Sequence, residues 1–456
     1  MAKLPSAGDR LIAPVYGGYA ATRDIPLDEL PDHEMPRRVA FDLIRDALML
    51  DGNARLNLAT FVTTFMEDEA CELMALAFDK NMIDKDEYPI TSKIENRCVN
   101  MVARLWHSAE DGQRTGVSTV GSSEAAMLAG MAFKWNWKAR QSAAGKPTDK
   151  PNMVMGINVQ VCWEKFCRYW EVEPRFVPMD GDRFHISPAE AVKLCDENTI
   201  GVVGILGSTY DGSYEPIKDL CKALDAHETE TGLDIPVHVD AASGGFIAPF
   251  LDEDLEWDFR LDRVHSINAS GHKYGLVFPG VGWVVWRDRS VLPEDLVFYT
   301  NYLGGQEMTL ALNFSRPGNQ VIGQYYNFLR FGWPGYTAIQ QACRDIATEL
   351  SAKIEALPNF ELITRGDELP VFAFKLKDEI TDYTGFDVSA RLRENGWQVP
   401  AYSFPKNRED LIAMRVVVKQ GFTRDMADML VADLEKYSLE LDKSGSVTTR
   451  RGGFSH

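Results

Sequence analysis

The stretch His238-Val239-Asp240-Ala241-Ala242 ends one apolar run of this chain, and a second apolar run leads into Ser270-Gly271-His272-Lys273. Such runs, each followed by small and polar residues, are typical of strands in an α/β sheet, where ligands bind at the carboxyl ends. Asp240 and Lys273 lie 33 positions apart (273 − 240). We therefore expect both side chains at one sheet edge, facing the same crevice.

The chemistry of these two side chains indicates a site for pyridoxal 5'-phosphate (PLP). A lysine amine can form a Schiff base with an aldehyde, and a carboxylate can keep a pyridinium nitrogen protonated, so that the ring accepts electrons. Taken alone, Asp240 could cap a turn and Lys273 could be an ordinary surface lysine. The two residues together favour the cofactor site.

A possible phosphate site precedes the helical stretch from residue 125 to about 140. Ser122 and Ser123 stand at the start of this stretch, where free N–H groups and the helix dipole attract an anion. An ordinary N-cap explains the same residues. This segment alone therefore does not decide between the two interpretations.

Three further polar residues follow predicted strands. His272 could contact a phosphate or a substrate carboxylate, or it could have a structural role. Gln160 and Thr209 each come after an apolar run. Either residue could touch a cofactor ring, and either could simply shape its loop.

Composition excludes several classes of protein. The chain has 456 residues, 45% of them hydrophobic, and a formal net charge of −19, which argues against nucleic acid or an anionic membrane as partner. It contains no apolar run long enough for a transmembrane helix and no secretory signal. The seven cysteines are scattered without metal-ligand spacing, so we expect reduced thiols, no metal and a cytoplasmic protein, with membrane association at low pH left open.

The pattern of apolar segments predicts four regions: an N-terminal arm (1–55) with a helix over 35–50, a large PLP-binding domain (56–340), a small α+β domain (341–442) and a tail (443–456). In the large domain, apolar runs alternate with helical stretches, which favours a mostly parallel sheet. The small domain is predicted to run helix (341–357), strand (371–375), helix (387–394), strand (414–418) and helix (424–441). The predicted strands of the large domain are Asn152–Met155, Thr199–Leu206, Ile235–Val239, Val264–Ile267 and Gly282–Trp286.

From about residue 35 to 440, the chain resembles the bacterial glutamate decarboxylases, which are fold-type I PLP enzymes of the group II decarboxylase family. The resemblance implies a mostly parallel seven-stranded sheet with helices on both faces and a small C-terminal α+β domain. The Ser270–Lys273 element would fit several amino-acid decarboxylases, whereas residues 57–61 and 84–89 are more specific to the glutamate enzymes. The matching segments are Asn57–Phe61, Asn81–Lys85, Glu87–Pro89, Val120–Glu124, His238–Gly245, Ser270–Lys273, Tyr302–Gly305, Asn313–Arg316 and Gly396–Pro400.

Carried over by motif, the resemblance implies roles around the cofactor. Lys273 would bind PLP covalently and Asp240 would pair with its ring nitrogen. Small and polar residues would hold the phosphate, and one of them would come from a neighbouring subunit. Two further residues would lie against the ring. These are Ser122, Ser123 and His272 for the phosphate, Ser315 from the neighbouring subunit, Gln160 over the ring face and Thr209 near the ring 3-hydroxyl.

The same resemblance implies a pocket for glutamate. Thr60, Phe61 and Asp84 match the pocket for the distal carboxyl, and Arg415 matches the residue that meets the α-carboxylate. Asp84 can lie beside a carboxylate only if one of the two groups is protonated, which low pH favours. We therefore expect activity in acid.

A loop residue, Tyr302, and the C-terminal residue, His456, complete the implied site. Lys273 or the loop residue Tyr302 would return a proton to Cα. His456, in the ending Phe454-Ser455-His456, resembles the terminal histidine of acid-activated bacterial enzymes, which is thought to enter the site and close it near neutrality. A tail without such a role is the alternative.

The implied reaction converts L-glutamate and a proton into 4-aminobutanoate (GABA) and carbon dioxide, in acid resistance or GABA metabolism. A homodimer would be the minimal unit and a hexamer would be possible, with no calmodulin control expected from this tail. The alternatives are a PLP-dependent decarboxylase of another amino acid, a lyase or aldolase of the same fold, and a non-catalytic regulatory or scaffold protein.

Overall fold

The computed structural model describes residues 28–32, 34–108, 115–300 and 307–446, so Tyr302 and His456 lie outside the described residues. The chain divides after Asn57 into two compact units. The first contains α1 (Arg37–Leu48), two residues shorter at each end than the predicted helix, and the short 3-10 helix η2 (Ala54–Leu56). No residue of α1 is buried, and its apolar residues include the exposed Phe41 and Ile44.

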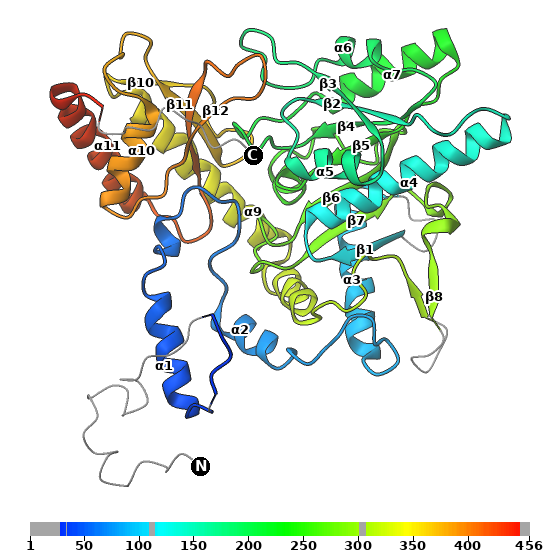
Figure 1. Ribbon diagram of the computed structural model, residues 1–456, viewed down its shortest axis with the longest axis horizontal. Helices are drawn as coiled ribbons and strands as arrows, with labels where there is room; N and C mark the ends of the chain where they lie inside the picture. Colours follow the sequence, from blue (N-terminus) through cyan, green and yellow to red (C-terminus); the bar gives the residue numbers. More distant parts are fainter. Residues whose placement is uncertain (1–27, 33, 109–114, 301–306, 447–456) are drawn as a thin grey trace. The chain divides into compact units, whose positions relative to one another are not determined.

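A seven-stranded sheet forms the centre of the second unit, as expected (Figure 1). Its strand order is β1-β7-β6-β5-β4-β2-β3. The pairs from β6 to β3 are parallel, and β7 is antiparallel to both of its neighbours, so only β7 runs against the others. The carboxyl ends of six strands therefore lie at one edge. The strands are β1 (Thr115–Thr119), β2 (Asn152–Gly156), β3 (Glu173–Val177), β4 (Thr199–Ile205), β5 (Val237–Asp240), β6 (Val264–Ser270) and β7 (Gly282–Trp286).

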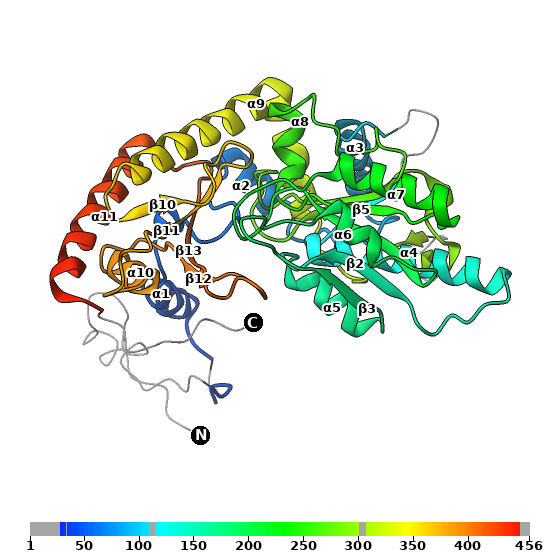
Figure 2. The same cartoon turned by 90° about the horizontal axis from the view of Figure 1, so that it is seen from above.

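Helices cover both faces of this sheet (Figure 2). On one face lie α4 (Ser122–Ala143) and α5 (Val161–Tyr169); on the other lie α3 (Pro89–Leu105), α6 (Pro188–Lys193) and α7 (Ile217–Thr231). Alternate residues of one strand belong to different cores: Val154 packs with α7, whereas Met153 and Met155 pack with α4. Because both faces are covered, β2, β4, β5 and β7 are buried along their whole length, and β2, β4 and β7 are accordingly apolar over most of their sequence.

Two strands of the sheet do not have such sequences. The strand β1 reads Thr-Gly-Val-Ser-Thr, and the edge strand β3 begins with exposed Glu173 and Pro174. An edge strand tolerates proline and charge because one of its sides pairs with no neighbour. These strands carry little of the apolar signal that revealed the others.

The long helix α9 (Asn319–Glu355) leads from the large sheet to the C-terminal part of the chain. Gly332 has φ 53° and interrupts the helical backbone just before Pro334, so the helix is kinked there. The predicted start at Gln341 was wrong: the helix begins 22 residues earlier (341 − 319). The expected domain boundary near residue 340 thus falls inside one helix.

The C-terminal part is a four-stranded antiparallel sheet in the order β10-β11-β13-β12, packed with two helices. The strands are β10 (Phe360–Leu362), β11 (Val371–Leu376), β12 (Ala401–Ser403) and β13 (Ile412–Val417), and the helices are α10 (Gly385–Glu394) and α11 (Arg424–Ser444). The remaining elements are the helices α2 (Asp68–Ala75) and α8 (Ala248–Leu251) and the hairpin of β8 (Phe298–Thr300) and β9 (Glu307–Thr309).

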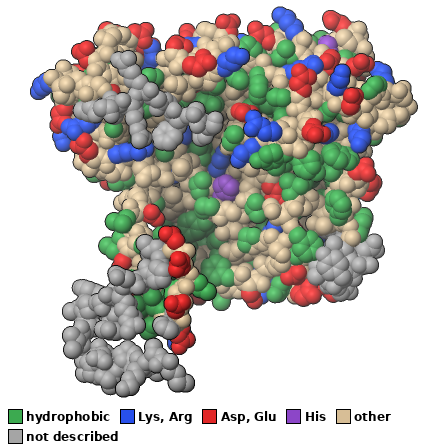
Figure 3. All heavy atoms as spheres, viewed as in Figure 1, with side chains coloured by type: hydrophobic (Ala, Val, Ile, Leu, Met, Phe, Trp, Pro, Cys, Tyr) green, Lys and Arg blue, Asp and Glu red, His purple; other side chains and the backbone are tan. Residues whose placement is uncertain are grey.

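Acidic and basic side chains are interspersed over the face drawn in Figure 3, so the negative charge is not confined to one area of that face. Within the described residues, no helix combines the length and apolar character needed to cross a bilayer.

Candidate active site

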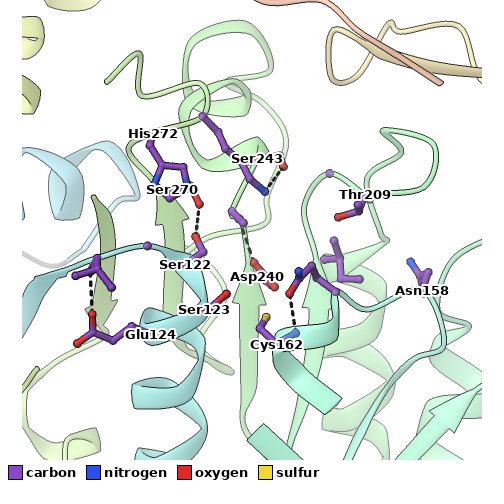
Figure 4. A pocket seen from close by; sticks show the side chains of 17 residues that line it. Ser122, Ser123, Glu124, Asn158, Cys162, Thr209, Asp240, Ser243, Ser270 and His272 are labelled. Atoms are coloured by element: carbon purple, nitrogen blue, oxygen red, sulfur yellow. Dashed lines mark hydrogen bonds between the residues drawn. The ribbon is translucent and has the colours of Figure 1, made fainter. Parts of the chain in front are cut away.

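A cavity of about 340 Å³ opens at the carboxyl edge of the large sheet (Figure 4). It is lined by the segments that follow β1, β2, β4, β5 and β6, because parallel strands bring their ends together there. The structure thus brings seven of the predicted site residues to one cavity. They are Ser122, Ser123, Gln160, Thr209, Asp240, His272 and Lys273.

Lys273 lies in the turn directly after β6. Its Nζ is 3.2 Å from Ser243 Oγ and 5.0 Å from the centre of the Phe61 ring. Burial lowers the pKa of the Lys273 amine; the positive charge of Arg415 acts in the same direction, whereas Asp240 opposes it. A lysine whose neutral form is favoured is a better nucleophile toward an aldehyde than a surface lysine.

Asp240 ends β5 and is only 5% exposed. Its Oδ2 accepts a hydrogen bond from Trp163 Nε1 (2.7 Å), and its Oδ1 accepts from Asn268 Nδ2 and from the Ala242 backbone N–H, both at 3.1 Å. The three N–H donors fix the direction of the carboxylate and leave both of its oxygens as acceptors. This arrangement fits a charged partner such as a pyridinium nitrogen.

The start of α4 is a candidate anion site. Ser122 is the first residue of this helix, and its Oγ lies 2.6 Å from Ser270 Oγ. A Cβ on Gly121 would come within 3.0 Å of His272 Cε1, and one on Gly282 would come within 2.5 Å of the Gly121 carbonyl carbon. Small residues therefore let the helix start, the lysine turn and β7 approach closely, which exposes N–H and hydroxyl donors to a phosphate.

His272 contributes to this anion site as a neutral ring. Burial, together with the neighbouring charge of Lys273, lowers the pKa of His272 to about 4. Its Nδ1 accepts from the Gly280 N–H at 3.4 Å, which leaves Nε2–H as the donor. Attraction of a phosphate near neutrality then comes from the helix start and hydroxyls rather than from a charged imidazole.

Phe61 and Arg415 lie beside the lysine. The Arg415 guanidinium is 4.9 Å from the centre of the Phe61 ring, donates to the Ala59 carbonyl at 2.6 Å, and also donates to the Thr209 carbonyl. Arg415 Nε is buried and has no hydrogen-bond partner among the described residues. Thr60, next to Phe61, is exposed.

Asp84 and Ser315 do not line the cavity in this chain. They lie close to each other instead: Asn81 Nδ2 donates to Ser315 Oγ at 3.2 Å, and the Asp84 N–H donates to the Asn81 carbonyl at 3.2 Å. Ser315 is exposed. Asp84 and Ser315 therefore belong to a second cluster, apart from the seven predicted residues that line the cavity. Thr60 and Phe61 are neighbours in the sequence, and Arg415 of β13 contacts Phe61.

The sequence analysis missed four residues that shape the site. Trp163 and Asn268 hold Asp240, Ser243 contacts the lysine amine, and Thr63 Oγ1 donates to the Lys273 carbonyl at 2.6 Å. Asn268 stands two residues before the end of β6, so strand alternation could have placed it on the same side as Ser270. Nothing in the local sequence marks the other three.

The family model for the pyridoxal-dependent decarboxylase conserved domain matches residues 31–377. The glutamate decarboxylase of Aliivibrio fischeri is 54% identical over 454 residues, covering 98% of each chain. The glutamate decarboxylase beta of Listeria innocua is 47% identical over 453 residues, again covering 98% of each chain. A solved structure of Lactobacillus brevis glutamate decarboxylase has a TM-score of 0.92 and 47% identity, and the match covers 96% of this chain and 100% of that one.

These similarities define the class: the chain belongs to the pyridoxal-dependent decarboxylase family. Its cofactor is therefore pyridoxal phosphate, in agreement with the buried amine and carboxylate at one cavity. The relatives named above are all glutamate decarboxylases, and each match covers essentially the whole of this chain.

Proposed function

We propose that this protein is a glutamate decarboxylase, which converts L-glutamate and a proton into 4-aminobutanoate and carbon dioxide. The observation that carries the proposal is the meeting of Lys273 and Asp240 at one cavity with Arg415 beside them. Full-length relatives that bear this name support the choice of substrate.

The residues present fit PLP. Lys273 would bind it covalently, Asp240 would pair with its ring nitrogen, and the start of α4 with Ser122, Ser123 and His272 would hold its phosphate. Gln160 and Thr209 would lie against the ring. When bound, PLP supplies an electron sink for the bond that breaks.

The chain's own groups orient the substrate and move the proton. The Arg415 guanidinium would bind the α-carboxylate, while Thr60 and Phe61 would contact the distal end, so that both ends of glutamate are fixed before the bond breaks. Lys273 Nζ would then deliver a proton to Cα, since its lowered pKa lets it exchange protons readily. Tyr302 is the alternative donor.

Asp84 would complete the pocket for the distal carboxyl, and Ser315 would contact the phosphate, each from a partner subunit. Two adjacent carboxyl groups require one proton between them, so the proposed pocket favours acid. His456 would close the site near neutrality. Membrane association at low pH is proposed separately from this closure. A homodimer is the proposed minimal unit, and a hexamer is compatible with it.

The direct test measures carbon dioxide and 4-aminobutanoate formed from L-glutamate with added PLP across the pH range, for wild type, Lys273→Ala and the surface control Lys406→Ala. We expect acid activity in wild type and control, and its loss in Lys273→Ala. Wild type that binds PLP without turning over glutamate would instead indicate a decarboxylase of another amino acid. Full activity at alkaline pH would contradict the proposed role of Asp84.

A further inference from the structure

A line of three buried polar side chains lies behind Asp240. His238 Nδ1 is 2.8 Å from Ser266 Oγ, His238 Nε2 is 2.6 Å from Asn268 Oδ1, and Asn268 Nδ2 donates to Asp240 Oδ1 at 3.1 Å. Ser266, His238 and Asn268 are each 0% exposed. The line comes from the pairing of β5 with β6, which sets His238 opposite Ser266 and Asp240 opposite Asn268.

Asp240 accepts at the end of this line of side chains, and this fixes the direction of every hydrogen bond in the line. Both oxygens of Asp240 accept hydrogen bonds from N–H groups, so Asn268 turns its NH₂ group toward Asp240 and its oxygen toward His238. His238 must then carry a proton on Nε2. In the neutral ring, Nδ1 accepts from the Ser266 hydroxyl, and every proton in the line points toward Asp240.

The neutral form of His238 is the form that burial favours. Burial lowers the pKa of His238 to about 4, against the opposing effect of Asp240. A neutral imidazole with a proton fixed on Nε2 places no second charge beside Asp240. It still passes polarisation along the line, because hydrogen bonds in a chain strengthen one another.

We propose that His238 is a positioning residue for the cofactor site, which fixes the amide orientation of Asn268 so that an N–H, not an oxygen, meets Asp240. The proposal rests on the PLP chemistry described above. Without His238, the Asn268 amide loses the donor that distinguishes its oxygen from its nitrogen. A rotated amide would place Oδ1 against the Asp240 carboxylate, and the two oxygens would repel.

The imidazole ring also supports the second side-chain donor of Asp240. The Trp163 ring packs 5.1 Å from the His238 ring, and Trp163 Nε1 donates to Asp240 Oδ2 at 2.7 Å. The His238 ring thus touches both side chains that orient the carboxylate. It touches neither the cavity nor Lys273 in any contact of the described residues, so its effect would pass through Asn268 and Trp163.

The test compares His238→Phe with a matched control, His265→Phe. Both histidines lie on neighbouring strands and pack edge-on against Phe133, with ring centres 6.4 and 6.5 Å away, but only His238 is hydrogen-bonded toward Asp240. For His238→Phe we expect a kcat about tenfold lower, weaker PLP binding and an altered pH dependence of the cofactor's visible absorbance, with KM changed little. The control should match wild type in each measurement.

Two further variants separate positioning from folding. The double variant His238→Phe/Asn268→Leu should lose no more kcat than Asn268→Leu alone, because phenylalanine keeps a ring against Trp163 and removes only the hydrogen bond to Asn268. Ser266→Ala, which removes only one hydroxyl, should lower kcat about twofold without changing KM, even if His238→Phe does not fold. Additive losses in the double variant, or wild-type kcat and spectra in Ser266→Ala, would overturn the proposal. Wild type that fails to bind PLP would instead overturn the proposed function.

Discussion

Two histidines affect how the protein responds to acid: the fully buried His238 behind Asp240 and the partly buried His272 at the cavity. Burial lowers the pKa of both His238 and His272 to about 4, from an ordinary value of 6.5. The folded chain keeps both rings neutral, whereas the unfolded chain protonates them below pH 6.5. The unfolded state therefore binds more protons between pH 6.5 and 4, and the free energy of unfolding falls as the pH is lowered through that window.

We expect this loss in PLP-free protein, and for the fully buried His238 it amounts to about 3 kcal/mol as an order of magnitude. Denaturant unfolding at several pH values would measure it. In His272→Gln the dependence on pH should be shallower than in wild type, because one of the two groups is gone. An identical slope in variant and wild type would show that His272 is not held neutral.

Sequence alone could identify the reacting residues but not the residues that hold them. Asp240 and Lys273 each follow an apolar strand, so their positions at the sheet edge could be predicted from that pattern. Trp163, by contrast, reaches Asp240 from the helix α5, 77 positions away. That contact depends on how α5 packs on the sheet, which no local pattern encodes.

At the scale of elements, the segment from Leu58 to Thr63 connects the small sheet with the lysine turn. From β13 and the residues after it, the Val417 N–H donates to the Leu58 carbonyl at 3.0 Å and Lys419 Nζ donates to the Val62 carbonyl at 3.2 Å. At its other end, the Thr63 N–H donates to the His272 carbonyl at 2.8 Å. The segment that carries Thr60 and Phe61 is therefore positioned by two different parts of the fold.

Loss of either tether should affect a different kinetic constant. Lys419→Met removes a buried charged donor next to the substrate-side residues, so we expect a rise in KM for glutamate of about tenfold, restored by Lys419→Arg. Thr63→Val removes the hydroxyl hydrogen bond to the Lys273 carbonyl and keeps the backbone one to the His272 carbonyl, so it should lower kcat by about fivefold. Burial lowers the pKa of Lys419 to about 8, so the Lys419 effect should diminish above that pH. Equal changes of kcat and KM in both variants would contradict this division.

The limits predicted for five strands of the large domain lie within three residues of the observed ones. Those of β7 coincide with the observed limits, whereas the predicted start of β5 at Ile235 precedes the observed start at Val237, although both strands are buried throughout. The helix α9 was predicted only from Gln341, since Gly332 and Pro334 interrupt the apolar pattern although the chain continues as one kinked helix. A backbone break of this kind is decided by packing on both sides of the kink.

At the scale of the whole molecule, the segment before α9 is held by two buried charged side chains, Glu124 and Arg316. Glu124 Oε1, at the start of α4, accepts from the Leu312 N–H at 2.9 Å, and Arg316 donates to Ser118 Oγ at 2.7 Å. Between these fixed points, Ser315 is exposed and Phe314 is 43% exposed. A rigid segment that presents an apolar ring and a hydroxyl outward is suited to contact another subunit.

Mixed dimers can decide whether Ser315 serves the site of the partner subunit. We expect Lys273→Ala and Ser315→Asp each to reduce activity strongly as homodimers, the second because a new charge would repel the phosphate. A mixed dimer of the two variants has one site that combines an intact Lys273 with an intact Ser315 only if these residues come from different chains. Co-refolding the variants should then restore activity toward half that of wild type per mixed dimer. If both residues act within one chain, every site in the mixture carries a substitution, and activity stays at the level of the parents.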